Sequence, residues 1–438
     1  MVFLKYLLLI SLITGTSSCF IFSPKKTIPS TTNARIDTLK KNANVIKPVI
    51  DSSKKIKKDT LRTSFINSLD STRPVRIAVL APLYLDSAFY GNTYNLGKSN
   101  IPKFFMPGLE FYDGVMMAVD SLNKEKEPAE IWIYDTRKKG QTIQSITAEM
   151  QKQKISMVLA SVTNPAEQKT LSDFSFNNSV PVISATYPND ASLSGNPFFI
   201  MINSTWKTHA DAVYKYVQQN YYNKNIFLIT KTGTLENKIL NRFNELKKTG
   251  RFPIAYSVML LNDDFSEEDI LPHLDSTKQN VIICGTLDED FGRNLIRVLN
   301  DAQSYNNTVA IGTPTWNGMA GTSGSACSNI QLIITTPFNY VHGYSRLNTL
   351  SANYKAKYYA RPSDMAYRGF ESMYHFTKLL IYNKSNFINK VSDTSFKIIN
   401  DFKIEPVRLS SNTFVPDYLE NKKIYFIKVV HGDVQSVN

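Results

Sequence analysis

Short apolar runs alternate with amphipathic helical patterns from about residue 73 to the end of the chain, and this alternation constrains the fold most strongly. The first block has strand-like runs at 76–82, 131–135, 157–160 and 180–184. Beyond Trp206 the pattern restarts, with strand-like runs at 226–229, 256–261, 281–283, 309–311 and 332–334, and a last run at 423–430. Strands that alternate with helices predict parallel sheets covered on both faces. Two such blocks predict an α/β protein with two doubly wound, parallel-sheet lobes.

The helical patterns are clearest at two places. Apolar residues recur at helical spacing over 109–122 and again over 364–382. Pro165 follows Asn164 directly after the third strand, which is typical of the first turn of a helix. Between the first strand and the first long helix lies an extended loop, 83–108, which is rich in aromatic residues.

The N-terminus has the layout of a signal peptide. Lys5 is followed by an apolar stretch over 6–13 and by small residues over 15–18. An apolar stretch of eight residues is too short to span a bilayer of about 30 Å. The small residues before Cys19 resemble a bacterial lipobox, in which the cysteine is acylated. The sequence therefore predicts a signal peptide over 1–18 and a lipid anchor on Cys19, with ordinary cleavage without lipid as the alternative.

The positive charge of the chain is concentrated in one polar segment. Residues 20–73 contain 12 Lys and Arg but only 4 Asp and Glu, a net charge of +8 out of +13 for the whole chain. This distribution argues against a nucleic-acid-binding face on the folded body. Residues 19–73 are predicted to be a flexible basic linker, whose lysines either keep it solvated or attract it to anionic lipid and cell-wall polymer.

Motifs for catalysis or metal binding are missing from the sequence. The five histidines are scattered, and there is no HExxH, GxSxG, P-loop or GxGxxG pattern. Besides Cys19 only Cys284 and Cys327 remain, without zinc-site spacing; we expect buried free thiols, with a disulfide as the alternative. The sequence thus predicts no catalytic residues, no metal, no cofactor and no enzyme activity.

Several blocks, in their order along the chain, resemble the type I periplasmic binding proteins, especially the receptors for branched-chain amino acids. The blocks are RIAVLAPL, GLEFYDGVMMAVDSLN, IWIYDT, MVLASVTNPAEQ, VPVISATYPN, NPFFIMINSTWKTHADAVYKYV and YRGFESMYHFTKLL. The resemblance covers about residues 76–432. It implies a three-strand hinge and two discontinuous lobes, with 74–201 plus 341–390 in lobe one and 202–340 plus 391–438 in lobe two.

Hydroxyl groups follow the strands where a ligand is expected. Ser161 and Thr163 precede the helix that Pro165 opens, and a helix N-terminus with nearby hydroxyls suits a carboxylate. The next strand ends at a loop that matches the family's second ligand-contacting loop and contains Ser184, Ala185 and Thr186. In lobe two, Thr286 and Asp288 are the candidates. The alternative is that these side chains cap helices.

The resemblance implies a binding protein that captures a small polar solute, such as an amino acid, between closing lobes. Such a protein serves ABC-type uptake or sensing, and its partners are the solute, a membrane permease and, through the lipid anchor, a membrane. The long aromatic loop and the basic linker favour an alternative, a lipoprotein that regulates cell-wall synthesis. Both hypotheses place the protein in a bacterial cell envelope, on the periplasmic side of the inner or the outer membrane.

Overall fold

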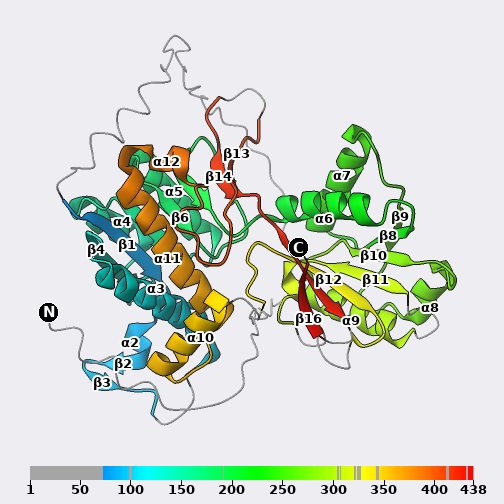
Figure 1. Ribbon diagram of the computed structural model, residues 1–438, viewed down its shortest axis with the longest axis horizontal. Helices are drawn as coiled ribbons and strands as arrows, with labels where there is room; N and C mark the ends of the chain where they lie inside the picture. Colours follow the sequence, from blue (N-terminus) through cyan, green and yellow to red (C-terminus); the bar gives the residue numbers. More distant parts are fainter. Residues whose placement is uncertain are drawn as a thin grey trace, which may run out of the picture.

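Two seven-stranded sheets, each in its own lobe, organise the chain (Figure 1). The computed structural model describes residues 73–97, 101–190, 192–302, 305, 307–319, 322, 327–341, 345–410, 414–430 and 433–437. The signal peptide, Cys19 and the basic linker up to residue 72 lie outside the described residues.

The sheet of lobe one has the order β13-β14-β7-β6-β5-β1-β4. All neighbouring strands are parallel except the edge pair of β13 and β14. The strands are β1 (Val75–Ala81), β4 (Ala129–Asp135), β5 (Met157–Ala160), β6 (Val182–Ser184), β7 (Phe199–Met201), β13 (Ile404–Val407) and β14 (Tyr418–Asn421).

Helices cover both faces of this sheet, because successive apolar side chains of β1 point to opposite faces and both faces must be buried. Ile77 of β1 packs in one core with Phe111, whereas the neighbouring Ala78 packs in the other core with Ile146. The first face is covered by α3 (Met106–Lys124), α10 (Ser345–Tyr358), α11 (Asp364–Asn383) and α12 (Phe387–Lys390), and the second by α4 (Ile143–Lys152) and α5 (Pro165–Asn178).

Two glycines allow α3 and α11 to approach each other closely. A Cβ atom added to Gly114 would lie 1.9 Å from the carbonyl oxygen of Ala366, and one added to Gly369 would lie 2.1 Å from that of Phe111. Helix α11, one of the two clearest helical patterns in the sequence, therefore packs back against α3, the first long helix of lobe one, although more than 200 residues separate them.

The sheet of lobe two has the order β16-β15-β12-β11-β10-β8-β9. Strands β8 to β12 are mutually parallel, and β15 and β16 continue the sheet antiparallel. Its elements are β8 (Asn225–Thr230), β9 (Ser257–Leu260), β10 (Asn280–Cys284), β11 (Thr308–Gly312), β12 (Gln331–Thr336), β15 (Tyr425–Val430) and β16 (Asp433–Val437), with α6 (Trp206–Asn220) and α7 (Thr234–Thr249) on one face and α8 (Glu267–Ile270) and α9 (Glu289–Asp301) on the other.

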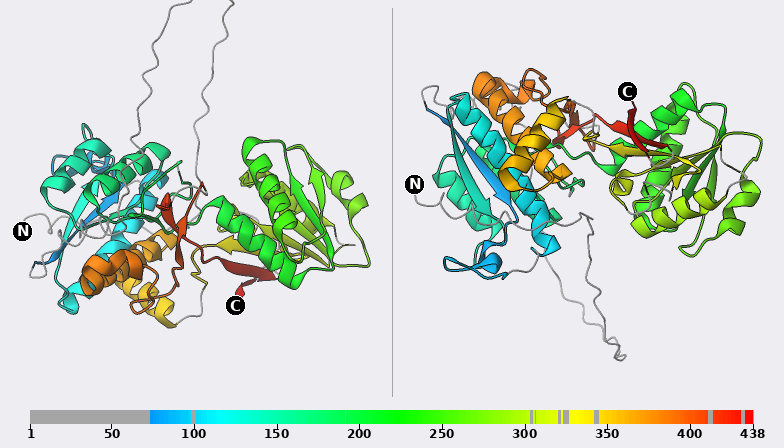
Figure 2. Two further views of the ribbon diagram at one scale, coloured as in Figure 1. Left: turned by 90° about the horizontal axis from the view of Figure 1, so that it is seen from above. Right: turned by 60° about the horizontal axis from the view of Figure 1, so that its bottom comes forward.

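The chain crosses between the lobes three times. The crossings are 202–205 between β7 and α6, the segment between β12 and α10, of which 337–341 are described, and 422–424 between β14 and β15. In Figure 2 the two lobes lie side by side, with the last crossing, in red, running between them. These observations confirm the predicted fold class, two parallel-sheet lobes joined by a three-strand hinge.

One predicted boundary needs correction. Residues 391–438 were expected in lobe two, but β13 and β14 belong to the sheet of lobe one, and only β15 and β16 lie in lobe two. Strands β13 and β14 are short, and β14 ends in Glu420 and Asn421, so no apolar run in the sequence indicates either strand. The long loop 83–108 also contains small elements, α2 (Leu85–Ala88), the hairpin β2–β3 (Phe89–Tyr90 and Thr93–Tyr94) and the 3-10 helix Lys103–Phe105.

A buried carboxyl group between α3 and α10 should make the stability of lobe one depend on pH. Asp113 accepts a hydrogen bond from the hydroxyl of Tyr354 (3.2 Å), and burial, with a smaller contribution from Glu110, raises its pKa from 3.8 to about 7. The folded state therefore keeps a proton that the unfolded state loses above pH 4. Stability should fall between about pH 4 and pH 7, by up to about 4 kcal/mol.

The variant Asp113→Asn tests this, because an amide is neutral at every pH. We expect it to match the wild type near pH 4 and to be more stable at pH 8 in urea unfolding followed by circular dichroism. Asp120→Asn is the control, since Asp120 lies on the same helix, is about half exposed and pairs with Lys357. Parallel pH profiles for the wild type and Asp113→Asn would contradict the prediction.

Candidate functional site

The carboxyl ends of the parallel strands of each lobe point toward the other lobe. In lobe one, β7 and β14 run directly into crossings, and the other parallel strands share their direction. In lobe two, β12 runs into the second crossing, and β8, β10 and β11 are parallel to it. The loops that follow β4, β5 and β6 therefore lie on the inter-lobe side, as do those that follow β8, β10 and β11. Ligands of open α/β sheets bind at such strand ends.

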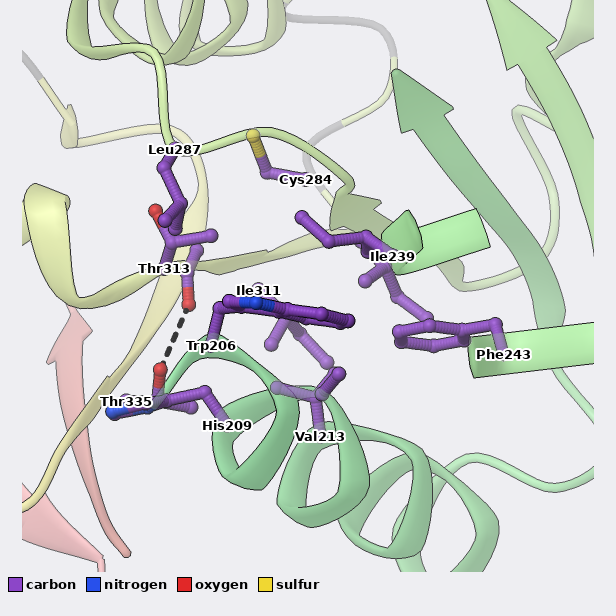
Figure 3. Close-up of a pocket in the computed structure, with 13 residues that line it drawn as sticks. Trp206, His209, Val213, Ile239, Phe243, Cys284, Leu287, Ile311, Thr313 and Thr335 are labelled. Carbon is purple, nitrogen blue, oxygen red and sulfur yellow. Dashed lines mark hydrogen bonds between the residues drawn. The ribbon is translucent and has the colours of Figure 1, made fainter. Parts of the chain in front are cut away.

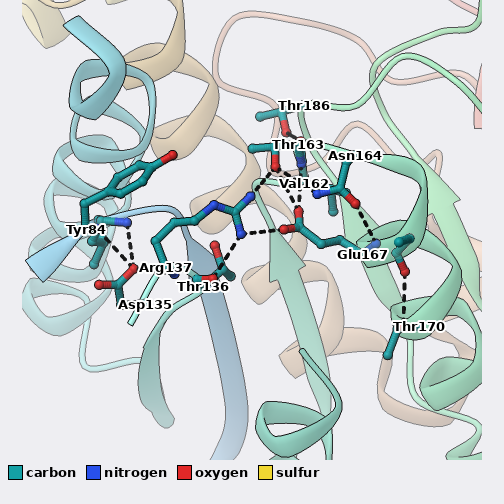
Figure 4. A network of polar contacts seen from close by, with 12 residues as sticks. Tyr84, Asp135, Thr136, Arg137, Val162, Thr163, Asn164, Glu167, Thr170 and Thr186 are labelled. Carbon is teal, nitrogen blue, oxygen red and sulfur yellow. Dashed lines mark hydrogen bonds and ion pairs between the residues drawn. The ribbon is translucent and has the colours of Figure 1, made fainter. Parts of the chain in front are cut away.

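The first candidate pair, Ser161 and Thr163, lies at the N-terminus of α5, where a hydrogen-bonded network already occupies the anion position (Figure 4). The carboxylate of Glu167 accepts hydrogen bonds from the backbone N–H and the hydroxyl of Thr163, both at 3.0 Å. Its other oxygen pairs with Nη1 of Arg137 at 2.5 Å, and Nη2 of Arg137 donates to the hydroxyl of Thr163. An internal carboxylate thus takes the donors that a ligand carboxylate would need.

The second candidate loop is held together by its own hydroxyl groups. The hydroxyl of Ser184 donates to Oε1 of Gln168 (2.9 Å), and that of Thr186 donates to the carbonyl oxygen of Val162 (2.7 Å). Ala185 is fully buried. The structure brings Thr163 and Thr186 to the same edge of the sheet, as expected, but both hydroxyls have partners within the chain.

The lobe-two candidates also have partners. The hydroxyl of Thr286 donates to Oε1 of Glu236 (2.7 Å). Asp288 caps α9, accepting from the N–H of Phe291 (2.9 Å), and its second oxygen pairs with Nζ of Lys231 (2.8 Å). The position where a ligand ammonium would meet Asp288 is therefore taken by a lysine of the neighbouring strand end. The helix-capping alternative describes what Asp288 does in this structure.

Two residues of the lobe-one network and a third polar anchor were not singled out from the sequence. Arg137 follows β4, and Glu167 is the third residue of α5, where an acidic residue often supports a helix N-terminus. Buried Asp135 accepts from the N–H groups of Leu83, Tyr84 and Leu85 at 2.9–3.2 Å, which fixes the start of the aromatic loop. The block DTR after a strand and Glu at that helix position were the available signals.

A small cavity of about 30 Å³ lies in lobe two beneath α6 and α7 (Figure 3). Its only histidine, His209, is 5% exposed, and neither ring nitrogen has a hydrogen-bond partner in the described structure. Burial lowers the pKa of His209 to about 3, so the ring is neutral at pH 7. The lining is otherwise mostly apolar: Trp206, Ala210, Val213, Ile239, Phe243, Ile283, Cys284, Leu287, Ile311, Gly312, Thr313 and Thr335. By size, the cavity suits one or two water molecules.

A larger hollow of about 210 Å³ flanks the hinge. Its floor contains Glu420 of β14, which is 1% exposed and accepts from the N–H and hydroxyl of Thr205 (2.7 and 2.9 Å) and from the hydroxyl of Thr208 (2.7 Å). Its second oxygen pairs with Lys422. Glu420, near the end of β14 just before the last crossing, therefore holds the N-terminus of α6, the first element of lobe two.

The remaining chemical features of the described residues are structural. Cys284 and Cys327 are both buried and are not joined in a disulfide, and burial raises the pKa of Cys284 to about 12. Within the described ranges there is no cluster of His, Cys, Asp and Glu able to hold a metal ion. A search of the same ranges finds no helix with the length and apolar character needed to cross a membrane.

Comparisons with known proteins agree with this architecture. No curated protein sequence matches the chain. A solved structure, the periplasmic ligand-binding protein of a branched-chain amino acid ABC transporter from Burkholderia xenovorans, is 14% identical, with a TM-score of 0.59 over 83% of this chain and 94% of that one. An ABC transporter substrate-binding protein from Desulfitobacterium hafniense, solved with leucine, is 12% identical, with a TM-score of 0.55 over 83% of this chain and 99% of that one.

At these identities the solved structures show a shared fold. The family model described as periplasmic binding protein matches residues 106–381, more than half of the chain and parts of both lobes. The chain therefore belongs to the periplasmic binding protein family.

Proposed function

We propose that this protein is an exported, lipid-anchored receptor that captures a small polar solute between its two lobes and delivers it to a membrane permease or reports its presence. The observation that carries the proposal is the placement of the strand-end loops of both sheets on the inter-lobe side, around a hinge of three crossings. Closure of such lobes around a ligand needs backbone changes at only a few residues, those of the crossings. No catalytic step is part of the proposal.

The nature of the solute follows only in part from the relatives. The Desulfitobacterium protein was solved with leucine, and an amino acid is a candidate here. In this chain, however, Glu167 fills the donors at α5, and Lys231 neutralises Asp288. A free amino acid would have to find its partners elsewhere between the lobes.

A thermal-shift screen of amino acids, small carboxylates, phosphates and neutral polar compounds tests this function. A compound that binds the folded protein should raise the melting temperature in proportion to the logarithm of its concentration once it is above Kd. At least one compound is expected to do so. A library in which no compound stabilises the protein would contradict capture of a small solute.

The lipid anchor is tested separately. Acylation of Cys19 should be visible in the mass of the mature N-terminal peptide, and Cys19→Ser should release the protein from the membrane fraction. One acyl chain binds a membrane only marginally, so stable anchoring needs more than one. A mature protein that begins elsewhere, or that carries no acyl chain, would contradict this part of the proposal.

A second function is favoured by the aromatic loop. Tyr90 is 84% exposed and Phe104 is 57% exposed, and Phe104 packs edge-on against Tyr84. Exposed aromatic residues of this kind are typical of protein interfaces. They support docking to a partner such as a cell-wall synthesis protein. Capture of such a protein from envelope extracts by the wild type, but not by a Tyr90→Ser, Phe104→Ser variant, would favour this function over transport.

A further inference from the structure

Arg368 lies at the boundary between the lobes. It is on α11, one turn after Asp364, whose carboxylate accepts a hydrogen bond from the side-chain amide of Asn317 of lobe two (3.2 Å). Residues four apart share a face of a helix, so Arg368 lies on the same side as this inter-lobe contact. Its guanidinium lies 4.0 Å from the ring centroid of Phe338, which is part of the second crossing.

The guanidinium of Arg368 has no carboxylate partner among the described residues. Its Nε is buried without a hydrogen-bond partner, its polar neighbour is the hydroxyl of Tyr340, and Asp364 acts on it through longer-range attraction. Five other arginines of the described chain form ion pairs with carboxylates: Arg76, Arg137, Arg242, Arg293 and Arg297. The described arginines for which the structure shows no such pair, Arg251, Arg346, Arg361 and Arg408, are exposed.

The nearest buried carboxylate on the same helix is engaged elsewhere. Glu371 accepts hydrogen bonds from the backbone N–H groups of Ile399 and Asn400 and from the side-chain amide of Asn400, at 2.5–2.9 Å. It also accepts from the hydroxyl of Tyr340 at 3.4 Å. Glu371 thus ties α11 to the segment before β13, and it does not neutralise Arg368.

A largely buried charge without a counter-charge is costly, and proteins rarely keep one without a use. Burial lowers the pKa of Arg368, and contact with the face of Phe338 offsets only part of the desolvation. The planar fork of arginine matches the two oxygens of a carboxylate or phosphate. The missing partner is therefore an oxyanion that none of the described residues supplies.

We infer that Arg368 is the oxyanion-binding residue of the inter-lobe site and that the captured solute carries a carboxylate or phosphate group. This inference rests on the proposed capture of a solute between the lobes. It places the anionic end of the solute against α11 and the second crossing. At the N-terminus of α5, by contrast, Glu167 already accepts from the backbone N–H of Thr163 and pairs with Arg137.

Acetate and inorganic phosphate are the probes, and Arg368→Met and Arg368→Lys are the variants. Each protein is titrated with each anion by thermal shift and calorimetry. We expect one anion to bind the wild type saturably and to bind Arg368→Met about 10- to 100-fold more weakly. Arg368→Lys should retain part of the affinity, because it keeps the charge but loses the fork. Binding of acetate but not phosphate would indicate a solute with a carboxylate group, and binding of phosphate but not acetate would indicate a phosphorylated solute.

Arg242→Met is the matched control, since Arg242 is a partly buried arginine that already pairs with Asp211 and Glu245. Phosphate stabilises many proteins because it is excluded from their surfaces, and the response of Arg242→Met measures this general effect. If Arg368→Met responds to both anions as Arg242→Met does, the inference is overturned. It is also overturned if neither anion stabilises the wild type.

Failure of the inference is distinguishable from failure of the proposed function. A neutral compound that stabilises the wild type and Arg368→Met equally would reject the role of Arg368 and leave capture between the lobes intact. A screen without any stabilising compound would reject both.

Discussion

Replacement of Glu420 by alanine is expected to lower the free energy of unfolding by about 3–5 kcal/mol, the range found when one partner of a buried ion pair is removed. The carboxylate is 1% exposed and accepts from Thr205, Thr208 and Lys422. Alanine would leave the ammonium group, two hydroxyls and the N–H at the start of α6 without their acceptor. Because this contact joins the last crossing to the first, the variant should also loosen the hinge.

Urea unfolding followed by circular dichroism measures this effect. Glu420→Gln should lose less stability, since an amide still accepts hydrogen bonds. Glu405→Ala is the matched control: Glu405 lies opposite Glu420 in the β13–β14 register, but its side chain is 45% exposed. We expect a change of about 0.5 kcal/mol or less for this control. Equal losses for the Glu405 and Glu420 variants would show that the carboxylate is not buried as described.

Replacement of Trp316 by alanine is expected to destabilise lobe two by about 3–5 kcal/mol, the cost of deleting a large buried aromatic side chain. Trp316 is fully buried, and its indole fits between two glycines. A Cβ atom on Gly312 would lie 2.0 Å from indole Cε3, and one on Gly292 would lie 2.4 Å from Nε1. Helix α9 and the end of β11 are therefore packed around this one ring.

The same urea experiment compares Trp316→Ala with Trp132→Ala. Trp132 lies on the edge strand β4 of lobe one and is only partly buried. Its removal should cost clearly less and should not affect lobe two. A loss below about 1 kcal/mol for Trp316→Ala would contradict the described core.

The fold was predictable where side-chain periodicity reports burial. Strands such as β10, buried at every position, read as apolar runs, and α3 reads as an amphipathic helix. The strands β13 and β14 were not predictable, because they are short and β14 buries Glu420 and Asn421. Buried polar residues of this kind are satisfied by partners about 200 residues away, and local sequence carries no trace of that pairing.

The candidate site was predictable in position but not in its contacts. The loops with Thr163, Thr186 and Asp288 do follow strand ends on the inter-lobe side. The sequence did not reveal that Glu167 and Lys231 take up the donors and the charge of these loops, because ion pairs between separate elements depend on tertiary packing. For the same reason, only the folded chain reveals that Arg368 is buried without a carboxylate partner among the described residues.

Capture between the lobes is tested most directly by the distance between them. Spin labels at Phe176→Cys on α5 and Tyr222→Cys after α6 occupy exposed positions in different lobes, and Cys284 and Cys327 are buried. In a Cys19→Ser background, pulsed electron paramagnetic resonance compares the free protein with the protein saturated by the most stabilising compound. We expect this distance to change by several ångströms and its distribution to narrow. An unchanged distribution at saturation would contradict closure around a solute.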